Sequence, residues 1–344
     1  MNQDKLMLVG ITTITANHCG TGQASGAIDL PIARETHTGL PVLPASTIKG
    51  VMRDGYGLPD TIEGQTESHE EKVNLVKDLF GPRPPKRANK NEDGDEQREE
   101  KQERDSLSAG NLVFLDGMLL AFPVRSLRGV FRWVTSPMLI NRLRRVIKAF
   151  DPNWSSVALK CPSPSSSNIV LVGTGRGTQT VSLEDMVFPP ARCNEAPAVD
   201  DLADSLAGFM SEGDKDGVAK SLKEKLVVVT DEVLTDLTLR GTTVNARIVL
   251  DRDNKTSDNL WYEETLPPDT VFATVIAPRP GARDGKLKRL RESLGKLRGA
   301  TADSSASSRT WYTQLGGNVT VGQGLVQLVF DVPVDDELST EGGK

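Results

Sequence analysis

Residues 18–54 read HCGTGQASGAIDLPIARETHTGLPVLPASTIKGVMRD, and this stretch is the most informative part of the chain. Its glycines at positions 20, 22 and 26 allow the backbone to approach a ligand closely. Lys49 and Arg53 are four residues apart, so they share one face of a helix, and Gly50 beside them leaves room for a sugar-phosphate backbone. Asp29 places one carboxylate in the irregular part of the stretch. The pattern predicts a close-fitting loop followed by an anion-binding helix.

The segments around this stretch alternate between strand and helix patterns. Residues 5–15 are rich in β-branched side chains and predict a first strand, and Ser46 is expected to cap a helix over residues 47–54. Further helices are expected over residues 70–80, 137–150 and 285–297, and further strands over residues 112–115, 117–123, 226–230, 270–276 and 325–332. This order favours an α+β fold with an antiparallel sheet and helices on one face. A ferredoxin-like core with large insertions satisfies it.

Three segments do not fit this core. Residues 82–108 contain almost no apolar side chains, which predicts a charged, mobile insertion. Residues 151–220 are only weakly patterned. Residues 231–264 have strand character around a polar turn and predict a projecting hairpin, on which Val244 and Ile248 would share one face.

The composition narrows the class of protein. The chain has 344 residues, and no run of about 18 apolar residues exists, so a membrane-spanning helix is not expected. The three cysteines, Cys19, Cys161 and Cys193, are far apart, which argues against a disulfide framework or zinc site and favours a reducing cytoplasm. The net charge is −6, yet residues 122–150 carry seven basic and no acidic residues, and residues 279–298 carry eight basic residues against two acidic ones. Such tracts indicate a confined anion-binding groove or, as the plainer alternative, solvated helix faces.

Four sequence blocks resemble one protein family. The run GTGQ…IDLPIARE…TGLPVLPASTIKGVMRD resembles the opening motif of the RAMP superfamily of CRISPR RNA-binding proteins, and its IDLPIARE part is similar to the backbone nuclease subunits of the Cmr, or type III-B, effector complex. The likeness continues, in the family's order, in LVFLDGMLLAFPVRSLRGVFRWVTSP (112–137), LWYEETLPPDTVF (260–272) and QLGGNVTVGQGLV (314–326). The blocks span nearly the whole chain, which is therefore expected to be a single RAMP domain.

The resemblance implies a fold and a role. The fold would be an RRM-like, ferredoxin-type palm with a β-hairpin thumb. Several copies would line up as a filament along a CRISPR guide RNA, together with other subunits of the Cmr complex, and would cut the paired single-stranded target RNA at regular intervals. Cleavage in the family depends on a divalent metal ion, Mg²⁺ or Mn²⁺ here, and on the aspartate of the IDLP motif, which is Asp29. One carboxylate suffices for Mg²⁺ because substrate phosphates and water complete its coordination; the alternative is a loop aspartate bonded to its own backbone.

The other candidate residues follow from residue type and place. His18 is a candidate for RNA contact or proton transfer, and Glu263 and Glu264 are candidates to approach the cut site, although both could be ordinary exposed carboxylates at a strand edge. Candidates to hold RNA are Lys49, Gly50, Arg53, Arg125, Arg128 and the glycine-rich loop of Gly316, Gly317, Gly322 and Gly324, whose amides would cradle an anion. Val244 and Ile248 would wedge between bases.

Two other functions compete with a target-cleaving endoribonuclease. One is a non-catalytic RNA-binding scaffold of a related type III CRISPR complex, and the retained Asp29 favours the nuclease over it. The other is a RAMP endonuclease that matures the guide, which usually relies on histidine general acid–base chemistry; this chain has only three histidines.

Overall fold

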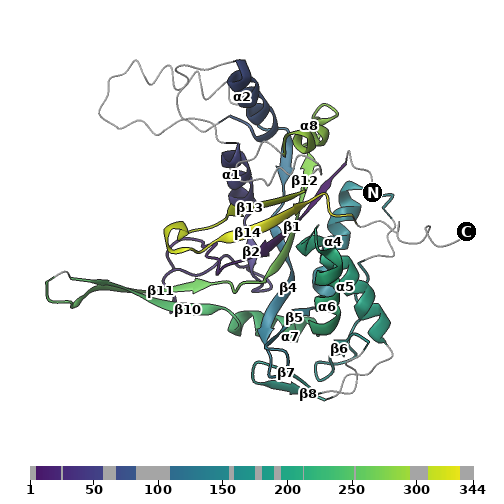
Figure 1. Cartoon of the computed structure of the whole chain (residues 1–344), viewed down its shortest axis with the longest axis vertical. Coiled ribbons are helices and arrows are strands. Elements are labelled where there is room, and N and C mark those ends of the chain that lie inside the picture. The colour runs from purple at the N-terminus through teal and green to yellow at the C-terminus, as the bar shows by residue number, and fades with distance from the viewer. Residues whose placement is uncertain are drawn as a thin grey trace, which may run out of the picture.

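Strand β1 (Met7–Thr13) lies inside the main sheet and fulfils the prediction of a first strand. The computed structural model describes residues 5–24, 26–56, 67–82, 109–154, 159–174, 180–189, 195–211, 213–251, 253–294 and 309–333 (Figure 1). The predicted charged insertion therefore lies, from residue 83 to residue 108, outside the described residues.

The main sheet is almost entirely antiparallel. Among the described residues it contains ten strands in the order β13–β14–β1–β12–β4–β5–β9–β6, with β2 paired to β4 and β3 paired to β12. Only β5 and β9 run parallel within it. The strands are β2 (Val42–Leu43), β3 (Leu112–Phe114), β4 (Gly117–Arg125), β5 (Phe131–Thr135), β6 (Leu171–Val172), β9 (Leu226–Val228), β12 (Val271–Pro278), β13 (Thr310–Gln314) and β14 (Leu325–Phe330). The α+β class is confirmed, whereas the ferredoxin-like topology stays a prediction.

Helices cover both faces of this sheet, so the expectation of helices on one face is wrong. Met7, Val9 and Ile11 of β1 point into one apolar core, and Leu6 and Leu8 point into the other. The first core includes side chains from α1 (Ala45–Gly55), α2 (Glu67–Phe80), α7 (Asp231–Arg240) and α8 (Lys286–Ser293), and the second includes α5 (Ala196–Met210), α6 (Lys215–Lys225) and most of the buried face of α4 (Pro137–Phe150). A sheet buried on both sides needs apolar residues at successive positions, which β1 supplies.

Some boundaries differ from the predicted ones for local reasons. Helix α1 begins at Ala45, with Pro44 before it, so Ser46 is not its cap. Helix α4 begins at Pro137 as expected, because proline loses no helical hydrogen bond in the first turn. The weakly patterned residues 151–220 contain α5 and most of α6, together with the short hairpin of β7 (Val181–Leu183) and β8 (Met186–Phe188).

Within the described chain, no helix is long and apolar enough to cross a membrane.

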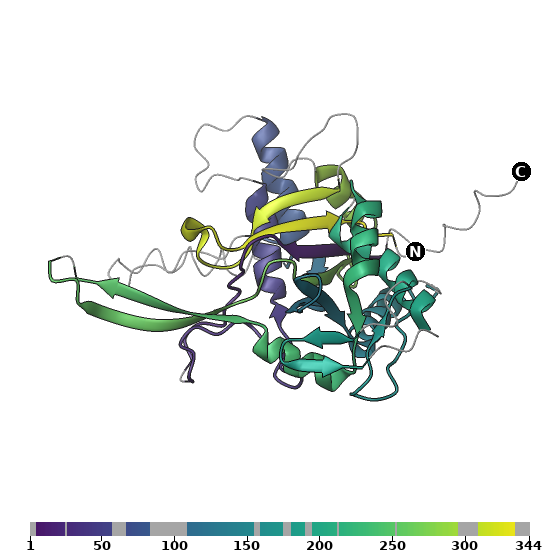
Figure 2. The same ribbon diagram turned by 60° about the horizontal axis from the view of Figure 1, so that its bottom comes forward.

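The projecting hairpin starts later than predicted. Residues 231–240 form helix α7, and the two-stranded hairpin consists of β10 (Thr243–Leu250) and β11 (Ser257–Thr265). Figures 1 and 2 both show this hairpin extending away from the rest of the protein. Its strands pair only with each other over most of their length, and its two ends join α7 and the sheet strand β12.

The contact between α2 and α8 makes stability depend on pH. Asp78 accepts hydrogen bonds from Lys286 Nζ at 2.6 Å, Arg289 Nη1 at 2.7 Å and Asn111 Nδ2 at 2.8 Å. Burial raises the pKa of Asp78. The hydrogen bond and charge of Lys286, together with Asn111 and Arg289, lower the pKa by more than burial raises it, so it lies below the ordinary value of 3.8. The charged form is therefore favoured in the folded state.

We expect Asp78→Asn to lower the free energy of unfolding by about 1–2 kcal/mol at neutral pH. Because the folded pKa is depressed, this difference should be complete above pH 3.8 and should shrink as the pH falls through the lower folded value. Urea unfolding from pH 7 to pH 3 measures it. Glu292→Gln, which breaks an exposed ion pair with Lys288 on the same helix, is the matched control and should change little. A destabilisation by Asp78→Asn that is independent of pH would contradict the account.

Candidate active site

The loop between β1 and β2 folds back along the base of the hairpin. Isolated bridges join Gly20 to Ile32 and Leu30 to Glu263, the latter in parallel orientation. Leu30 N donates to the Tyr262 carbonyl at 3.0 Å, and Glu264 N donates to the Leu30 carbonyl at 2.9 Å. Loop residues 29–32 therefore lie beside β11 like a short extra strand.

Asp29 is positioned by this pairing. Its Oδ2 accepts a hydrogen bond from Tyr262 N at 2.7 Å, and its carbonyl accepts one from Ala24 N at 2.9 Å. The residue is half-buried at the base of the hairpin. The alternative of a carboxylate bonded to its own loop backbone does not describe this contact, because the partner lies 233 positions away.

His18 lies against the same segment of β11. Its Nδ1 is 2.7 Å from the Glu264 carbonyl, which can only accept, so Nδ1 donates and Nε2 is the acceptor in the neutral ring. A Cβ on residue 20 would lie 2.5 Å from Nε2, so Gly20 provides the space for the ring. His18 and Asp29 thus both bond to the main chain of residues 262–264.

Glu263 and Glu264 are buried, at 2% and 4% exposure, so the expectation of ordinary exposed carboxylates is wrong. Glu263 accepts hydrogen bonds from Asn318 Nδ2 and, at 3.3 Å, from Arg247 Nε, and its Oε1 lies 3.9 Å from His18 Nδ1. Glu264 accepts from Arg34 Nη2 at 2.6 Å, Thr242 Oγ1 at 2.7 Å and Ile32 N at 3.1 Å. Both carboxylates have structural partners, and their catalytic assignment stays a prediction.

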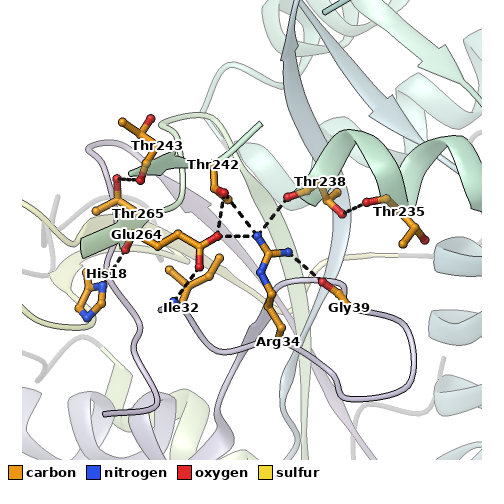
Figure 3. Close-up of polar contacts among 10 residues, drawn as sticks. All are labelled: His18, Ile32, Arg34, Gly39, Thr235, Thr238, Thr242, Thr243, Glu264 and Thr265. Carbon is orange, nitrogen blue, oxygen red and sulfur yellow. Dashed lines mark hydrogen bonds and ion pairs between the residues drawn. The ribbon is translucent and has the colours of Figure 1, made fainter. Parts of the chain in front are cut away.

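Arg34 is the residue that sequence reasoning missed (Figure 3). Its guanidinium donates to the carbonyls of Gly39 at 2.8 Å and Thr238 at 3.2 Å, as well as to Thr242 and Glu264. One side chain therefore connects the loop, the last turn of α7 and both ends of the hairpin. The only signal in the sequence was its place in the IDLPIARE block, because its partners are as many as 230 positions away.

The glycine-rich loop closes the other side of His18. Gly317 N donates to the His18 carbonyl at 2.9 Å, and a Cβ on residue 316 would lie 2.5 Å from that oxygen. Gly316, Gly322 and Gly324 all have positive φ, which side chains rarely adopt. A Cβ on residue 324 would meet the Leu315 carbonyl at 2.8 Å, whereas residue 322 borders open space. Gly316 and Gly324 are thus required by packing, and RNA contact by this loop stays a prediction.

Helix α1 adjoins this region through the Cys19 thiol, which is hydrogen-bonded to Thr47 and whose pKa burial raises to about 11. Lys49 and Arg53 follow one turn apart, both half-buried, and the space beside Gly50 is open. Burial lowers the pKa of Lys49, and the positive charge of Arg53 lowers it further. Arg53 also donates to the Pro82 carbonyl at 3.1 Å. A cation beside another cation is stabilised when an anion binds, as the phosphate-binding prediction requires.

The remaining basic residues differ in their exposure and in their partners. Arg125 and Arg128 are exposed near the loop between β4 and β5, and Arg125 pairs with Glu184 of the β7–β8 turn at 3.0 Å. None of their described contacts joins them to His18 or Asp29. Arg142 pairs with Glu35 at 2.5 Å. Arg132 is buried, and its Nη1 donates a hydrogen bond to the Glu224 carbonyl. The predicted basic tract is therefore not one continuous groove.

The hairpin exposes apolar side chains. Val244 and Ile248 are 46% and 54% exposed, and Ile248 lies opposite Leu260 of β11, which is also exposed. Residues two and four apart on a strand share a face, so Val244 and Ile248 lie on one side of β10. Their insertion between bases stays a prediction.

A metal ion would have few protein ligands here. Among the described residues, no group of three or more His, Cys, Asp or Glu side chains is arranged to hold a metal ion. Glu263 and Glu264 are committed to internal partners, which leaves Asp29 as the half-buried carboxylate at the hairpin base. A single hard oxygen ligand fits Mg²⁺ or Mn²⁺ only where substrate phosphates and water complete the coordination.

We expect Gly316→Ala to destabilise the protein by about 1–3 kcal/mol, because it combines positive φ with a clash against the His18 carbonyl. Gly322→Ala is the matched control, since it has the same φ sign and no neighbour within 4 Å. Urea unfolding measures the destabilisation, and amide exchange of Gly317 reports the contact with His18. Equal destabilisation by the two variants would show that close packing of residue 316 on His18 contributes nothing to stability.

Comparison with known proteins places this geometry in a family. The model of the RAMP superfamily matches residues 10–327. A Pyrococcus furiosus protein described as "CRISPR system Cmr endoribonuclease Cmr4" is 30% identical over 349 residues, which cover 98% of each chain. The crystal structure of oligomeric Cmr4 from Pyrococcus furiosus has a TM-score of 0.63 at 24% identity, covering 96% of this chain and 100% of that one. A chain of the type III-B Cmr-beta cryo-EM structure bound to cognate target RNA has a TM-score of 0.60 at 20% identity, covering 94% and 96%. The two structures share the fold, and the sequence matches show that this chain belongs to the RAMP superfamily and is homologous to Cmr4.

Proposed function

We propose that this chain is the repeating backbone subunit of a type III-B Cmr complex and an endoribonuclease within it. Copies of the chain bind a CRISPR guide RNA in the cytoplasm, next to other Cmr subunits, and cut the paired target RNA at regular intervals. The support comes from a homologue that is named an endoribonuclease, and from solved relatives described as oligomeric and as bound to target RNA. The head-to-tail contacts of a polymer-tracking chain build open filaments rather than closed dimers.

The position of Asp29 is the observation that supports cleavage most directly. Its carboxylate is bonded to β11 at the base of the projecting hairpin, where we expect a nucleotide displaced by the hairpin to lie. Cleavage by the neighbouring 2′-hydroxyl forms a bond from the 2′-oxygen to phosphorus as that hydroxyl gives up its proton, and it breaks the bond to the 5′-oxygen, which takes up a proton. Asp29 orients the attacking hydroxyl, and the Nε2 side of His18 contacts RNA or exchanges a proton.

A divalent metal ion, Mg²⁺ or Mn²⁺, belongs to this proposal. Asp29 would be its protein ligand, and when bound it would stabilise negative charge on the phosphate. Glu263 and Glu264 keep their internal partners and hold the base of the hairpin. They are the next candidates should Asp29 prove dispensable.

A non-catalytic scaffold is the second candidate function. The hydrogen bond between Asp29 Oδ2 and Tyr262 N favours it, because a carboxylate used to fasten a loop need not perform chemistry. The two functions differ in what Asp29→Asn does. Asparagine keeps an oxygen that can accept the Tyr262 hydrogen bond, but it loses the negative charge.

We expect complexes that carry Asp29→Asn to assemble and bind guide and target RNA normally, and to cut the target more than about a hundredfold more slowly. The measurement is single-turnover cleavage of labelled target, with and without a chelator. Asp216→Asn, which removes an exposed carboxylate on α6, is the control and should cut at the native rate. Native cleavage by Asp29→Asn would reject the nuclease role of this residue. Cleavage that persists in chelator would reject the metal alone, and failed assembly would favour the scaffold.

A second prediction concerns Lys49 and Arg53. If both hold phosphates, replacing either by alanine should weaken guide binding regardless of RNA sequence, and each replacement should lower the salt slope by about one ion. Lys220→Ala, which removes an exposed cation on α6, is the control. Titration of the complex with guide RNA at several salt concentrations gives both the affinity and the slope. A double variant with native affinity and slope would remove α1 from the RNA interface.

A further inference from the structure

Arg34 makes four hydrogen bonds from a largely buried position. Its side chain is 18% exposed, and its Nη2 donates to Thr238, Thr242 and Glu264, which belong to three different segments. Thr242 stands immediately before β10, and Glu264 is the penultimate residue of β11. The guanidinium therefore holds both ends of the hairpin to the helix that precedes it (Figure 3).

Glu264 links Arg34 to the candidate active site. Its Oε2 accepts from Ile32 N, its own N donates to the Leu30 carbonyl, and its carbonyl accepts from His18 Nδ1. Asp29 is bonded to Tyr262, two residues earlier on the same strand. A movement of β11 relative to α7 would therefore move Asp29 and His18 with it, unless Arg34 holds the strand in place.

We propose that Arg34 is a positioning residue for RNA cleavage, which locks both ends of the hairpin to the loop that carries Asp29. The inference rests on the proposed function, since it concerns the same carboxylate. Arg34 does not need to touch RNA for this role. It fixes the angle at which the hairpin leaves the protein and hence where Asp29 lies relative to a nucleotide displaced by the hairpin.

The chain offers a matched control for this role. Arg142 pairs with Glu35 at 2.5 Å, and its side chain is 17% exposed, close to the 18% of Arg34. Both ion pairs involve the loop between β1 and β2, but none of the described contacts of the Arg142 pair reaches the hairpin. Arg34→Met and Arg142→Met thus remove similar, largely buried cations, and only the first removes an anchor of the hairpin.

The experiment compares these variants in complexes loaded with guide RNA. We expect Arg34→Met to slow single-turnover cleavage by about tenfold or more, with target affinity within about twofold of native, because misplacement of a catalytic group costs rate rather than binding. Arg142→Met should cleave at close to the native rate. Arg34→Lys keeps a positive charge beside Glu264 but cannot span the same partners, so it should fold and remain slow.

Two further measurements separate positioning from plain stabilisation. In Arg34→Met combined with Glu264→Gln no unpaired buried charge is left, so stability should recover, while cleavage should stay slower than in Glu264→Gln alone. Hydrogen exchange of the full-length chain without RNA should be faster at Leu30 and Tyr262 in Arg34→Met and native in Arg142→Met. This readout does not depend on cleavage.

The outcomes distinguish this inference from the proposed function. Native cleavage by Asp29→Asn would overturn the proposed role of Asp29, and the role of Arg34 in positioning it, while the endoribonuclease function itself would stand. Inactive Asp29→Asn together with near-native Arg34→Met or Arg34→Lys would overturn only the positioning role. Unchanged exchange at Leu30 and Tyr262, or recovery of cleavage in the double variant, would also overturn it.

Discussion

The pairing of loop residues 29–32 with strand β11 is the constraint on which the candidate site depends. A hairpin of two strands has little stability of its own, so β10 and β11 need anchors at their ends. Main-chain bonds from Leu30 to Tyr262 and Glu264 provide one anchor, and the Arg34 guanidinium provides another. Because the same contacts hold Asp29 and His18, the elements that anchor the hairpin also build the site.

The carboxylates beside this pairing differ in burial and in their partners. Burying a carboxylate is costly unless it is paired, and Glu263 and Glu264 are each paired with an arginine, Arg247 and Arg34 respectively. Those partners give both glutamates a structural role. Asp29 accepts a main-chain hydrogen bond and stays half-buried at the surface. The local arrangement therefore separates carboxylates that hold the hairpin from the one that faces solvent, which supports Asp29 as the reactive group.

Local patterns predicted much of the fold, and long-range contacts explain what they missed. The strand at β1 and the helix at α4 follow from β-branched residues and from Pro137 in the first turn. Helix α5 was missed because it lies in a stretch that is otherwise weakly patterned, although Val199, Leu202, Ala203 and Leu206 recur at helical spacing, with Asp200, Asp201 and Asp204 on the opposite side. The family motif identified Asp29, whereas the role of Arg34 depends on partners more than 200 positions away.

The central claim is that the base of the hairpin brings Asp29 to the RNA bond that is cut. The most direct measurement is a cryo-electron microscopy structure of the complex with guide RNA and a target that carries a 2′-deoxy substitution at each cut position, which prevents cleavage. The account predicts the Asp29 carboxylate within hydrogen-bond or single-water reach of the uncut linkage beneath the hairpin, with the Tyr262 contact retained. Target RNA that passes the hairpin with Asp29 facing away from every uncut linkage would contradict it.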